Sequence, residues 1–182
     1  MARPLLIVVG TKALLFDKDS GNKLFKRFFG KPFASRKPKP EQEYEPPFVL
    51  SLYEALYLCE RGEVDIEIEG SRASCDDLRR YAESIVPRFA ERYAVYRDLR
   101  DRGYIVRSGM KFGTDFAVYE IGPGYEHAPY LVLVVDSSSM LDPISIVRLG
   151  RLSHSVKKHS VLAVVDRDRG RIDYLVFKWV RM

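Results

Sequence analysis

The stretch YIVRSGMKFGTDFAVYEIGPGYEHAPYLVLVVD, residues 104–136, decides the fold of the second half of the chain. It contains three short runs rich in β-branched and aromatic residues: YIVRSG (104–109), TDFAVYEIG (114–122) and YLVLVVD (130–136). Glycine and proline separate the runs, as they do in the turns that connect strands. We therefore predict three consecutive strands in this stretch.

A helix and two further strands are predicted after these three. The stretch DPISIVRLGRLSHSVKK (142–158) is typical of a helix that is capped by Asp142 and has Pro143 at its first position. SVLAVVD (160–166) and RIDYLVFKWV (171–180) are strand-like runs around an RDRGR turn. Three strands, a helix and two more strands predict a mixed sheet with helices packed on it.

The first half of the chain alternates strand-like and helix-like runs, so its sheet is also expected to carry helices. Its last part is helical, and Pro87 fits the first turn of the helix that leads into the second half. The predicted elements are a hairpin of PLLIVV (4–9) and ALLF (13–16), a helix in GNKLFKRFFG (21–30), a strand and a Ser51-capped helix in FVLSLYEALYLCERG (48–62), a strand in VDIEIEG (64–70), and helices in SRASCDDLRRYAESIV (71–86) and IVPRFAERYAVYRDLRDRG (85–103).

The predicted fold is α/β, in the α+β sense, with two domains. A small mixed αβ domain spans residues 1–85, and residues 86–182 form the second domain. The segment 30–47 holds five prolines and changes from basic to acidic along its length. Because it has no hydrophobic periodicity, it is predicted to be a long exposed loop.

Composition and charge restrict the class of protein. Thirty Lys and Arg against twenty-five Asp and Glu give a net charge of +5, which favours an acidic partner, nucleic acid first. Cys59 and Cys75 show neither zinc-ligand spacing nor a disulfide framework, so we predict neither. The apolar runs are too short to span a membrane and no signal peptide is recognisable, which predicts a cytoplasmic protein without a membrane partner.

Three side chains of the second half suffice for one reaction, the cleavage of RNA by its own 2′-OH. Tyr119 ends a strand, His127 lies in a Gly/Pro-rich turn, and Lys157 or Lys158 precedes a strand. The reaction needs a base, an acid and a cation, and it needs no metal or other cofactor. A tyrosine with an ordinary pKa of about 10 is a poor base, and we expect a nearby cation such as Lys158 to favour the phenolate. Tyr125 remains an alternative base.

Ordered motifs give this set a family resemblance. RGY.V..G.KFG.DF.VY, the Gly-rich turn into H..YLV, and R..HSV.K....AVVD together cover residues 89–166. They resemble the catalytic domain of the archaeal tRNA-splicing endonucleases, and the chain is similar to the catalytic subunit of the crenarchaeal, heterotetrameric type. The resemblance implies a nuclease-like second domain with Tyr119 as general base, His127 as general acid and Lys158, rather than Lys157, as the cation.

The resemblance also implies a substrate and a partner. The substrate is precursor tRNA with a bulge–helix–bulge, one bulge base of which is held by Arg151 and by Arg171 or its rival Arg181. The last strand is expected at a sheet edge, where the family dimerises. The turn DRDRGR (166–171) holds more arginine than acid, which departs from the acidic docking loop of the family. We therefore expect a separate structural subunit to supply that loop, giving an α2β2 heterotetramer.

Two alternatives and one further surface stay open. A metal-dependent nuclease would use carboxylates such as Asp115, Asp136 and Asp166, but these do not form the compact acid-x-Lys arrangement. A non-catalytic, structural or RNA-binding subunit of the same complex is the second alternative. His154 and His159 are interpreted as structural. In the Pro-rich loop, the three basic residues Arg36, Lys37 and Lys39 are predicted to contact the RNA backbone.

Overall fold

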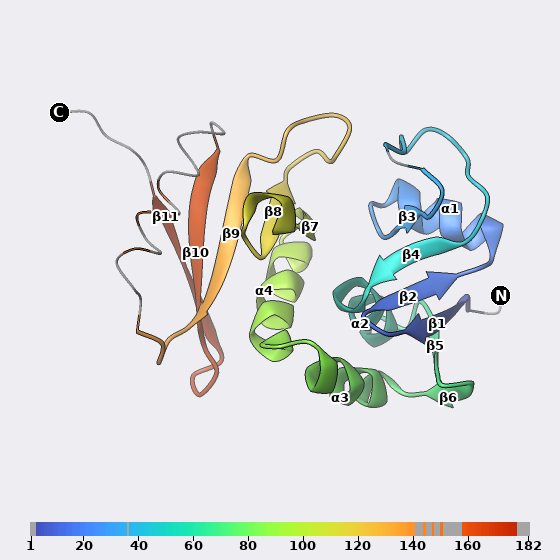
Figure 1. Ribbon diagram of the computed structural model, residues 1–182, viewed down its shortest axis with the longest axis horizontal. Helices are drawn as coiled ribbons and strands as arrows, with labels where there is room; N and C mark the ends of the chain where they lie inside the picture. Colours follow the sequence, from blue (N-terminus) through green and yellow to red (C-terminus); the bar gives the residue numbers. More distant parts are fainter. Residues whose placement is uncertain are drawn as a thin grey trace. The chain divides into compact units, whose positions relative to one another are not determined.

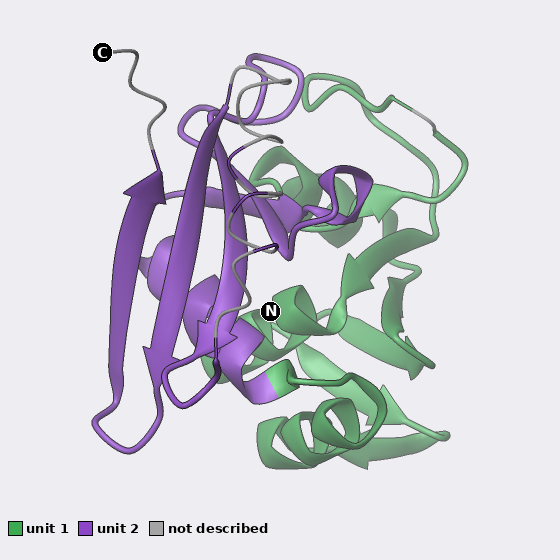
Figure 2. Cartoon of the chain, turned by 60° about the vertical axis from the view of Figure 1, so that its left-hand side comes forward, with its two compact units in different colours: residues 1–89 green, residues 90–182 purple. Residues whose placement is uncertain are grey.

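The computed structural model describes residues 3–35, 37–140, 144, 147, 150 and 158–177. The chain divides into two compact units, Met1–Phe89 and Ala90–Met182, which Figure 2 shows in two colours. No described helix combines the length and apolar character that crossing a bilayer requires. The sequence had indicated a mixed αβ architecture, and both units have it.

The first unit contains a six-stranded mixed sheet with the strand order β3-β4-β2-β1-β5-β6 (Figure 1). β1 pairs in parallel with β5, and all the other neighbours are antiparallel. The predicted β1–β2 hairpin is confirmed. The elements are β1 (Leu5–Val9), β2 (Lys12–Leu15), α1 (Lys18–Lys26), β3 (Lys31–Pro32), β4 (Phe48–Ser51), α2 (Leu52–Glu60), β5 (Asp65–Ile68), β6 (Ser71–Ala73) and α3 (Cys75–Ile85).

Capping explains where the helices of this unit begin. Ser51 caps α2 as predicted, and Glu54 completes a capping box with it. α1 begins before the predicted range because the Asp17 side chain accepts from the Ser20 N–H. It ends at Lys26, before the predicted stop at Gly30.

The start of the predicted 71–86 helix is wrong, because Ser71–Ala73 form strand β6. Ile68 pairs with Ser71 across a turn formed by Glu69 and Gly70, which both have positive φ, at 51° and 76°. Two central residues with positive φ are typical of a tight hairpin turn. This hairpin uses residues that the helical pattern had claimed, and α3 starts only after Ser74, which caps it.

The interpretation of the cysteines is also wrong, since Cys59 and Cys75 form a disulfide. Cys59 lies in the last turn of α2 and Cys75 is the first residue of α3. Their Cα atoms are 5.7 Å apart, within the range that a disulfide spans. Nothing in the spacing of the two cysteines indicates this, because the packing of the two helices brings them together.

The second unit contains a five-stranded mixed sheet in the order β11-β10-β9-β8-β7 (Figure 1). β9 and β10 are parallel and the other pairs are antiparallel, so the predicted mixed sheet and its five strands are confirmed. Of the predicted 142–158 helix, only Ile144, Val147, Gly150 and Lys158 lie inside the described residues, and the first three are helical. The elements are α4 (Phe89–Asp101), β7 (Ile105–Ser108), the 3-10 helix η1 (Met110–Phe112), β8 (Phe116–Tyr119), β9 (Tyr130–Asp136), β10 (His159–Asp166) and β11 (Arg171–Phe177).

Helix α4 covers one face of this sheet (Figure 2). It begins after Pro87 rather than including it, and its side chains Tyr93, Tyr96 and Leu99 are buried. The Tyr174 hydroxyl of β11 donates to Asp98 Oδ2 of α4 at 2.6 Å. Side chains alternate between faces along a strand, so Tyr119, which follows the buried Val118, belongs to the opposite face.

Candidate active site

The register of the five-stranded sheet brings Tyr119 and Lys158 to the same end. Val118 of β8 pairs with Tyr130 of β9, and His159 of β10 pairs with the same Tyr130. Tyr119 directly follows Val118, and Lys158 directly precedes His159. Both residues therefore flank the segment that leads into β9, and this segment contains the predicted general acid.

The turn between β7 and β8 fixes the place of β8. A side chain at Gly109 would meet backbone atoms of Phe116 at 2.7 and 2.8 Å, so the close approach requires glycine here. Asp115 accepts from the Val134 N–H through Oδ2 at 2.7 Å and pairs through Oδ1 with Arg92 Nε at 2.7 Å. These residues belong to the KFG.DF motif region, and their contacts give them a structural role.

Tyr119 is half-buried at the end of β8 and packs against a small apolar cluster of Ala117, Ala128 and Leu131. Burial raises the pKa of Tyr119 above its ordinary value of 10.0. The positive charge of Arg107 opposes this pKa shift, and the negative charge of Glu126 adds to it. We expected a cation such as Lys158 to favour the phenolate; among the described residues the cation that opposes the raised pKa of Tyr119 is Arg107 on β7, and burial outweighs it.

His127 is exposed on the loop between β8 and β9. The residue before it, Glu126, holds the beginning of the loop: its Oε1 atom accepts from the backbone N–H groups of Glu120 at 2.7 Å, Ile121 at 2.6 Å and Gly122 at 3.2 Å. These bonds lower the pKa of the Glu126 carboxyl, that from Ile121 most. The loop that carries His127 is thus tied to the end of β8.

Lys158 fixes the other side of His127. Its Nζ donates to the carbonyl oxygen of Ala128, the residue after His127, at 2.6 Å. The ammonium also lies over the ring of Phe112, 5.5 Å from the ring centroid. Burial lowers the pKa of Lys158 from its ordinary value. The lysine therefore lies beside the histidine loop and near the apolar cluster that holds Tyr119.

Arg171, one of the predicted base-holding arginines, is not brought to this place. Arg171 pairs with Asp166 at the far end of β10, whereas Lys158 precedes the near end. The offset from Lys158 to Asp166 is about 26 Å at 3.3 Å per residue, and Arg171 contacts Asp173 at 2.7 Å. Arg151, His154, Lys157 and Arg181 lie outside the described residues.

The remaining candidates of the second unit have other surroundings. Tyr125, the alternative base, is on the same loop and is 54% exposed. His159 lies beside the Tyr130 ring, 5.7 Å between centroids, on the face opposite to Tyr119. The carboxylate of Asp136 accepts from the Ser138 N–H at 2.8 Å, and that of Asp166 accepts from the Arg169 N–H at 3.0 Å. Among the described residues, no three His, Cys, Asp or Glu side chains gather in a group that could hold a metal ion.

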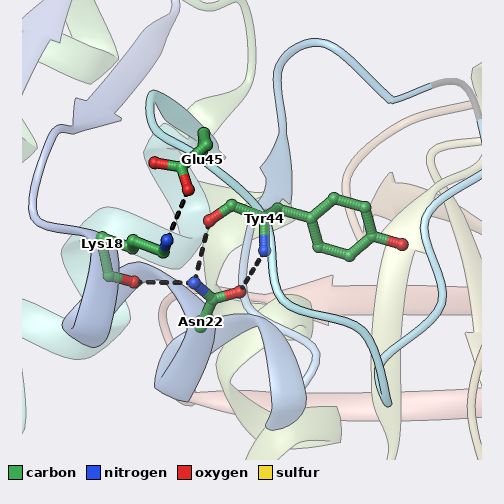
Figure 3. A network of polar contacts seen from close by, with 4 residues as sticks. All are labelled: Lys18, Asn22, Tyr44 and Glu45. Atoms are coloured by element: carbon green, nitrogen blue, oxygen red, sulfur yellow. Dashed lines mark hydrogen bonds and ion pairs between the residues drawn. The ribbon is translucent and has the colours of Figure 1, made fainter.

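In the first unit, the Pro-rich loop is fastened by Asn22 of α1 (Figure 3). The Asn22 amide nitrogen donates to the carbonyl oxygens of Tyr44 and Lys18, both at 2.9 Å, and its oxygen accepts from the Tyr44 N–H at 2.9 Å. Glu45 pairs with Lys18, and Glu43 lies 3.9 Å from Lys26. Two acidic residues of the loop are thus directed toward lysines of α1.

Two basic residues of the same loop face solvent. Lys37 and Lys39 are exposed, and Arg36 lies outside the described residues. The backbone N–H of Lys39 donates to the Tyr44 hydroxyl at 2.8 Å, which links the basic half to the fastened half. The loop therefore has a defined path that leaves two lysine side chains in water.

Three residues of functional interest were missed from the sequence: Asn22, Arg107 and Glu126. Glu126 offers a weak signal, because it is a carboxylate next to a candidate acid in a Gly-rich turn, where backbone N–H groups are often free to bind it. Asn22 and Arg107 offer none, since their partners come from other segments.

The arrangement provides three chemical groups at one end of the sheet. A phenol, an exposed imidazole and an ammonium ion flank the segment leading into β9. An imidazole suits proton transfer near neutral pH, and an ammonium ion stabilises negative charge that develops in a transition state. Such a set can promote acid–base cleavage of a phosphodiester whose nucleophile is part of the substrate.

Two family models match the chain, one for each half. The model described as "tRNA intron endonuclease, N-terminal domain" matches residues 7–79. The model described as "tRNA intron endonuclease, catalytic C-terminal domain" matches residues 89–174. The second match includes Tyr119, His127 and Lys158.

Curated relatives match over nearly the full length. A tRNA-splicing endonuclease of Hyperthermus butylicus is 47% identical over 175 residues, which covers 95% of this chain and 96% of the relative. One of Sulfurisphaera tokodaii is 42% identical over 176 residues, or 96% and 98% of the two chains. One of Saccharolobus solfataricus is 43% identical over 178 residues, or 97% and 98%.

Proposed function

Since the chain belongs to the tRNA-splicing endonuclease family, we propose that it is a catalytic subunit that cleaves precursor tRNA at intron boundaries. The observation that carries this proposal is the convergence of Tyr119, the His127 loop and Lys158 at one end of the sheet. The substrate is a bulge–helix–bulge, a shape whose unstacked bases a protein can recognise.

The proposed reaction is an internal transesterification. Tyr119 removes the 2′-OH proton, the 2′ oxygen attacks the adjacent phosphorus, and His127 donates a proton to the departing 5′ oxygen. Lys158 stabilises the additional negative charge on the phosphorane. The products are a 2′,3′-cyclic phosphate and a 5′-hydroxyl, and no metal ion takes part.

The raised pKa of Tyr119 has a consequence for this reaction. At neutral pH only a small fraction of the phenol is ionised, because burial outweighs the effect of Arg107. The rate of cleavage should therefore rise with pH as the base-competent fraction increases. A raised pKa makes the phenolate scarcer and also a stronger base once it forms.

We place Lys37, Lys39 and Arg36 of the loop, together with Arg151, on the RNA. If Arg171 is the second base-holding arginine, it acts on an RNA bound at another chain, because it lies at the far end of its own sheet. Arg181 is the alternative. Arginines on both sides of a base can stack on it.

The proposed assembly is an α2β2 heterotetramer with a structural subunit. Strand β11 lies at the edge of the five-stranded sheet, as predicted, and exposes Leu175 and Val176 by about half. Such an edge can pair with another chain. A fully active homotetramer formed by this chain alone would contradict the two-subunit assembly.

The test is cleavage of a bulge–helix–bulge RNA in excess EDTA, with and without a co-expressed partner subunit. We compare the wild type with His127→Ala and, as a matched control, with His159→Ala on the opposite face. The proposal expects a cyclic phosphate product that is lost only in His127→Ala. Cleavage that stops on chelation would favour a metal-dependent nuclease, and no cleavage with any partner would favour a structural or RNA-binding subunit.

A further inference from the structure

One carboxylate oxygen in the loop between β8 and β9 accepts three hydrogen bonds. Glu126 Oε1 lies 2.7, 2.6 and 3.2 Å from the backbone nitrogens of Glu120, Ile121 and Gly122. Consecutive N–H groups that converge in this way form a concave site for an anion. Here the anion is a side chain of the same loop, so the contact closes the loop on itself.

This contact lies between the two residues that are proposed to transfer protons. Glu120 directly follows Tyr119, and Glu126 directly precedes His127. A single side chain therefore joins the backbone next to the proposed base to the backbone next to the proposed acid. The Tyr125 and Glu126 N–H groups both donate to the Gly122 carbonyl at 3.2 Å, which narrows the loop further.

On its other side His127 is held through Ala128, whose carbonyl accepts from Lys158 Nζ at 2.6 Å. The exposed histidine is thus bracketed by two fixed neighbours, one tied to β8 and the other to the residue that precedes β10. The bond from Lys158 belongs to a residue already placed in the reaction. The three bonds that Glu126 accepts belong to a residue that takes no part in the proposed reaction.

We propose that Glu126 is the positioning residue of the general acid: its carboxylate fixes the 120–127 loop so that His127 faces the departing 5′ oxygen. The inference rests on the proposed function. It adds a residue that need not touch RNA and acts through the backbone. A displacement of about 1 Å in a reacting group can cost on the order of 100-fold in rate, so the loss of this contact should be visible in the chemical step.

Glu126 also has an electrostatic effect on Tyr119, which a neutral side chain at the same position would lack. Its negative charge adds to the raised pKa of Tyr119. Removing the charge while keeping an acceptor oxygen should ease ionisation of Tyr119 and preserve the loop. Keeping the charge while shortening the side chain should do the opposite.

The experiment uses the assembled enzyme and a bulge–helix–bulge RNA under single-turnover conditions. We compare Glu126→Gln, Glu126→Asp and Glu126→Ala with Glu120→Gln as the matched control. The Glu120 carboxylate accepts from the Tyr130 hydroxyl at 2.9 Å instead of from the loop backbone. The Kd for RNA, the melting temperature and the pH–rate profile are measured in parallel.

We expect Glu126→Ala and Glu126→Asp to slow cleavage by roughly 10- to 100-fold at saturating RNA, with the Kd for RNA unchanged. Glu126→Gln should retain most of the rate, and the rising limb of its pH–rate profile should move to lower pH. The Glu120→Gln control should cleave like the wild type. Wild-type cleavage by Glu126→Ala, or equal losses of rate in Glu126→Gln and Glu126→Ala, would overturn the proposal.

Hydrogen exchange of the amides of residues 120–122 tests the contact without any RNA. Protection should fall in Glu126→Ala and Glu126→Asp and persist in Glu126→Gln, whereas unchanged protection in all three would overturn the proposal. If the wild type does not cleave RNA, the proposed function fails. The exchange pattern would still decide whether Glu126 holds the loop.

Discussion

Two irregular segments carry the predicted functional residues, and each is fastened by one polar side chain in a different way. The Pro-rich loop is held from outside by Asn22, a buried neutral amide on α1. The His127 loop is held from within by Glu126, a charged carboxylate. The difference suits their proposed tasks, because the first loop presents lysines to a polyanion and the second aligns groups that exchange protons.

The two loops also differ in how their charges are distributed. In the Pro-rich loop the acidic residues Glu43 and Glu45 approach lysines of α1, and the exposed lysines remain toward solvent. In the His127 loop the negatively charged carboxylate of Glu126 accepts hydrogen bonds from backbone N–H groups. We infer that the first loop contributes to binding and the second to the rate of the chemical step.

The largest expected effect lies next to the second segment and distinguishes Tyr119, at the end of β8, from Tyr125 in the loop. Tyr119→Phe should slow cleavage by about 100- to 10,000-fold, because a general base is lost, while the Kd for RNA stays the same. Tyr125→Phe, which removes an exposed hydroxyl from the same loop, should cleave like the wild type. Single-turnover kinetics over a pH range check this, and the opposite result would make Tyr125 the base.

The next largest effect is expected when the contact between Asn22 and the Pro-rich loop is removed. Asn22→Ala leaves the backbone of Tyr44 without its amide partner, which should cost about 1–3 kcal/mol in the free energy of unfolding. The rate of cleavage at saturating RNA should not change. Gln42→Ala, which removes an exposed hydrogen bond from the Tyr44 hydroxyl and leaves the Tyr44 backbone paired with Asn22, is the control. Denaturant unfolding measures the cost, and equal stability of the two variants would show that Asn22 does not hold the loop.

A smaller effect concerns the exposed lysines of the first segment. If Lys37 and Lys39 each neutralise one phosphate, replacing both with alanine should reduce the salt slope of RNA binding by about 1.4–1.8. Lys26→Ala should change the slope less, because Glu43 already lies near that ammonium. Binding titrations at several salt concentrations measure this. An unchanged salt slope in the double variant would show that these lysines do not contact the RNA backbone.

The smallest expected effect is a difference in pH dependence between the contact made by the Glu126 carboxylate and the contact made by the neutral Asn22 amide. The Glu126 carboxyl has a pKa below its ordinary 4.5 in the folded protein. Its contribution to stability is therefore fully present above pH 4.5 and is lost as the pH falls through the lowered pKa. Between pH 6 and 8 neither loop should change.

Below that range the amides of residues 120–122 should lose protection, whereas the Tyr44 amide, which is held by the non-titrating Asn22, should keep it. Exchange rates corrected for intrinsic pH dependence measure this difference. Equal acid sensitivity of the two loops would contradict it.

Much of the architecture was predictable because it depends on local patterns. Alternating apolar residues gave the five strands of the second unit, and Ser51 with Glu54 marked the start of α2. The edge position of β11 was predicted because β11 is the last of the predicted strands. The β5–β6 hairpin was missed because two residues with positive φ at Glu69–Gly70 override a helical pattern.

For the site, the sequence by itself determined the kinds of residues, since Tyr119, His127 and Lys158 stand in ordered motifs that the family resemblance interprets. Only the tertiary structure decided which groups surround them. Arg107 acts on Tyr119 from a neighbouring strand, Arg171 lies at the far end of the sheet, and Cys59 meets Cys75 through helix packing. The physical reason is that hydrophobic period and capping act over a few residues, whereas charge, burial and bond formation depend on which distant segments the fold places side by side.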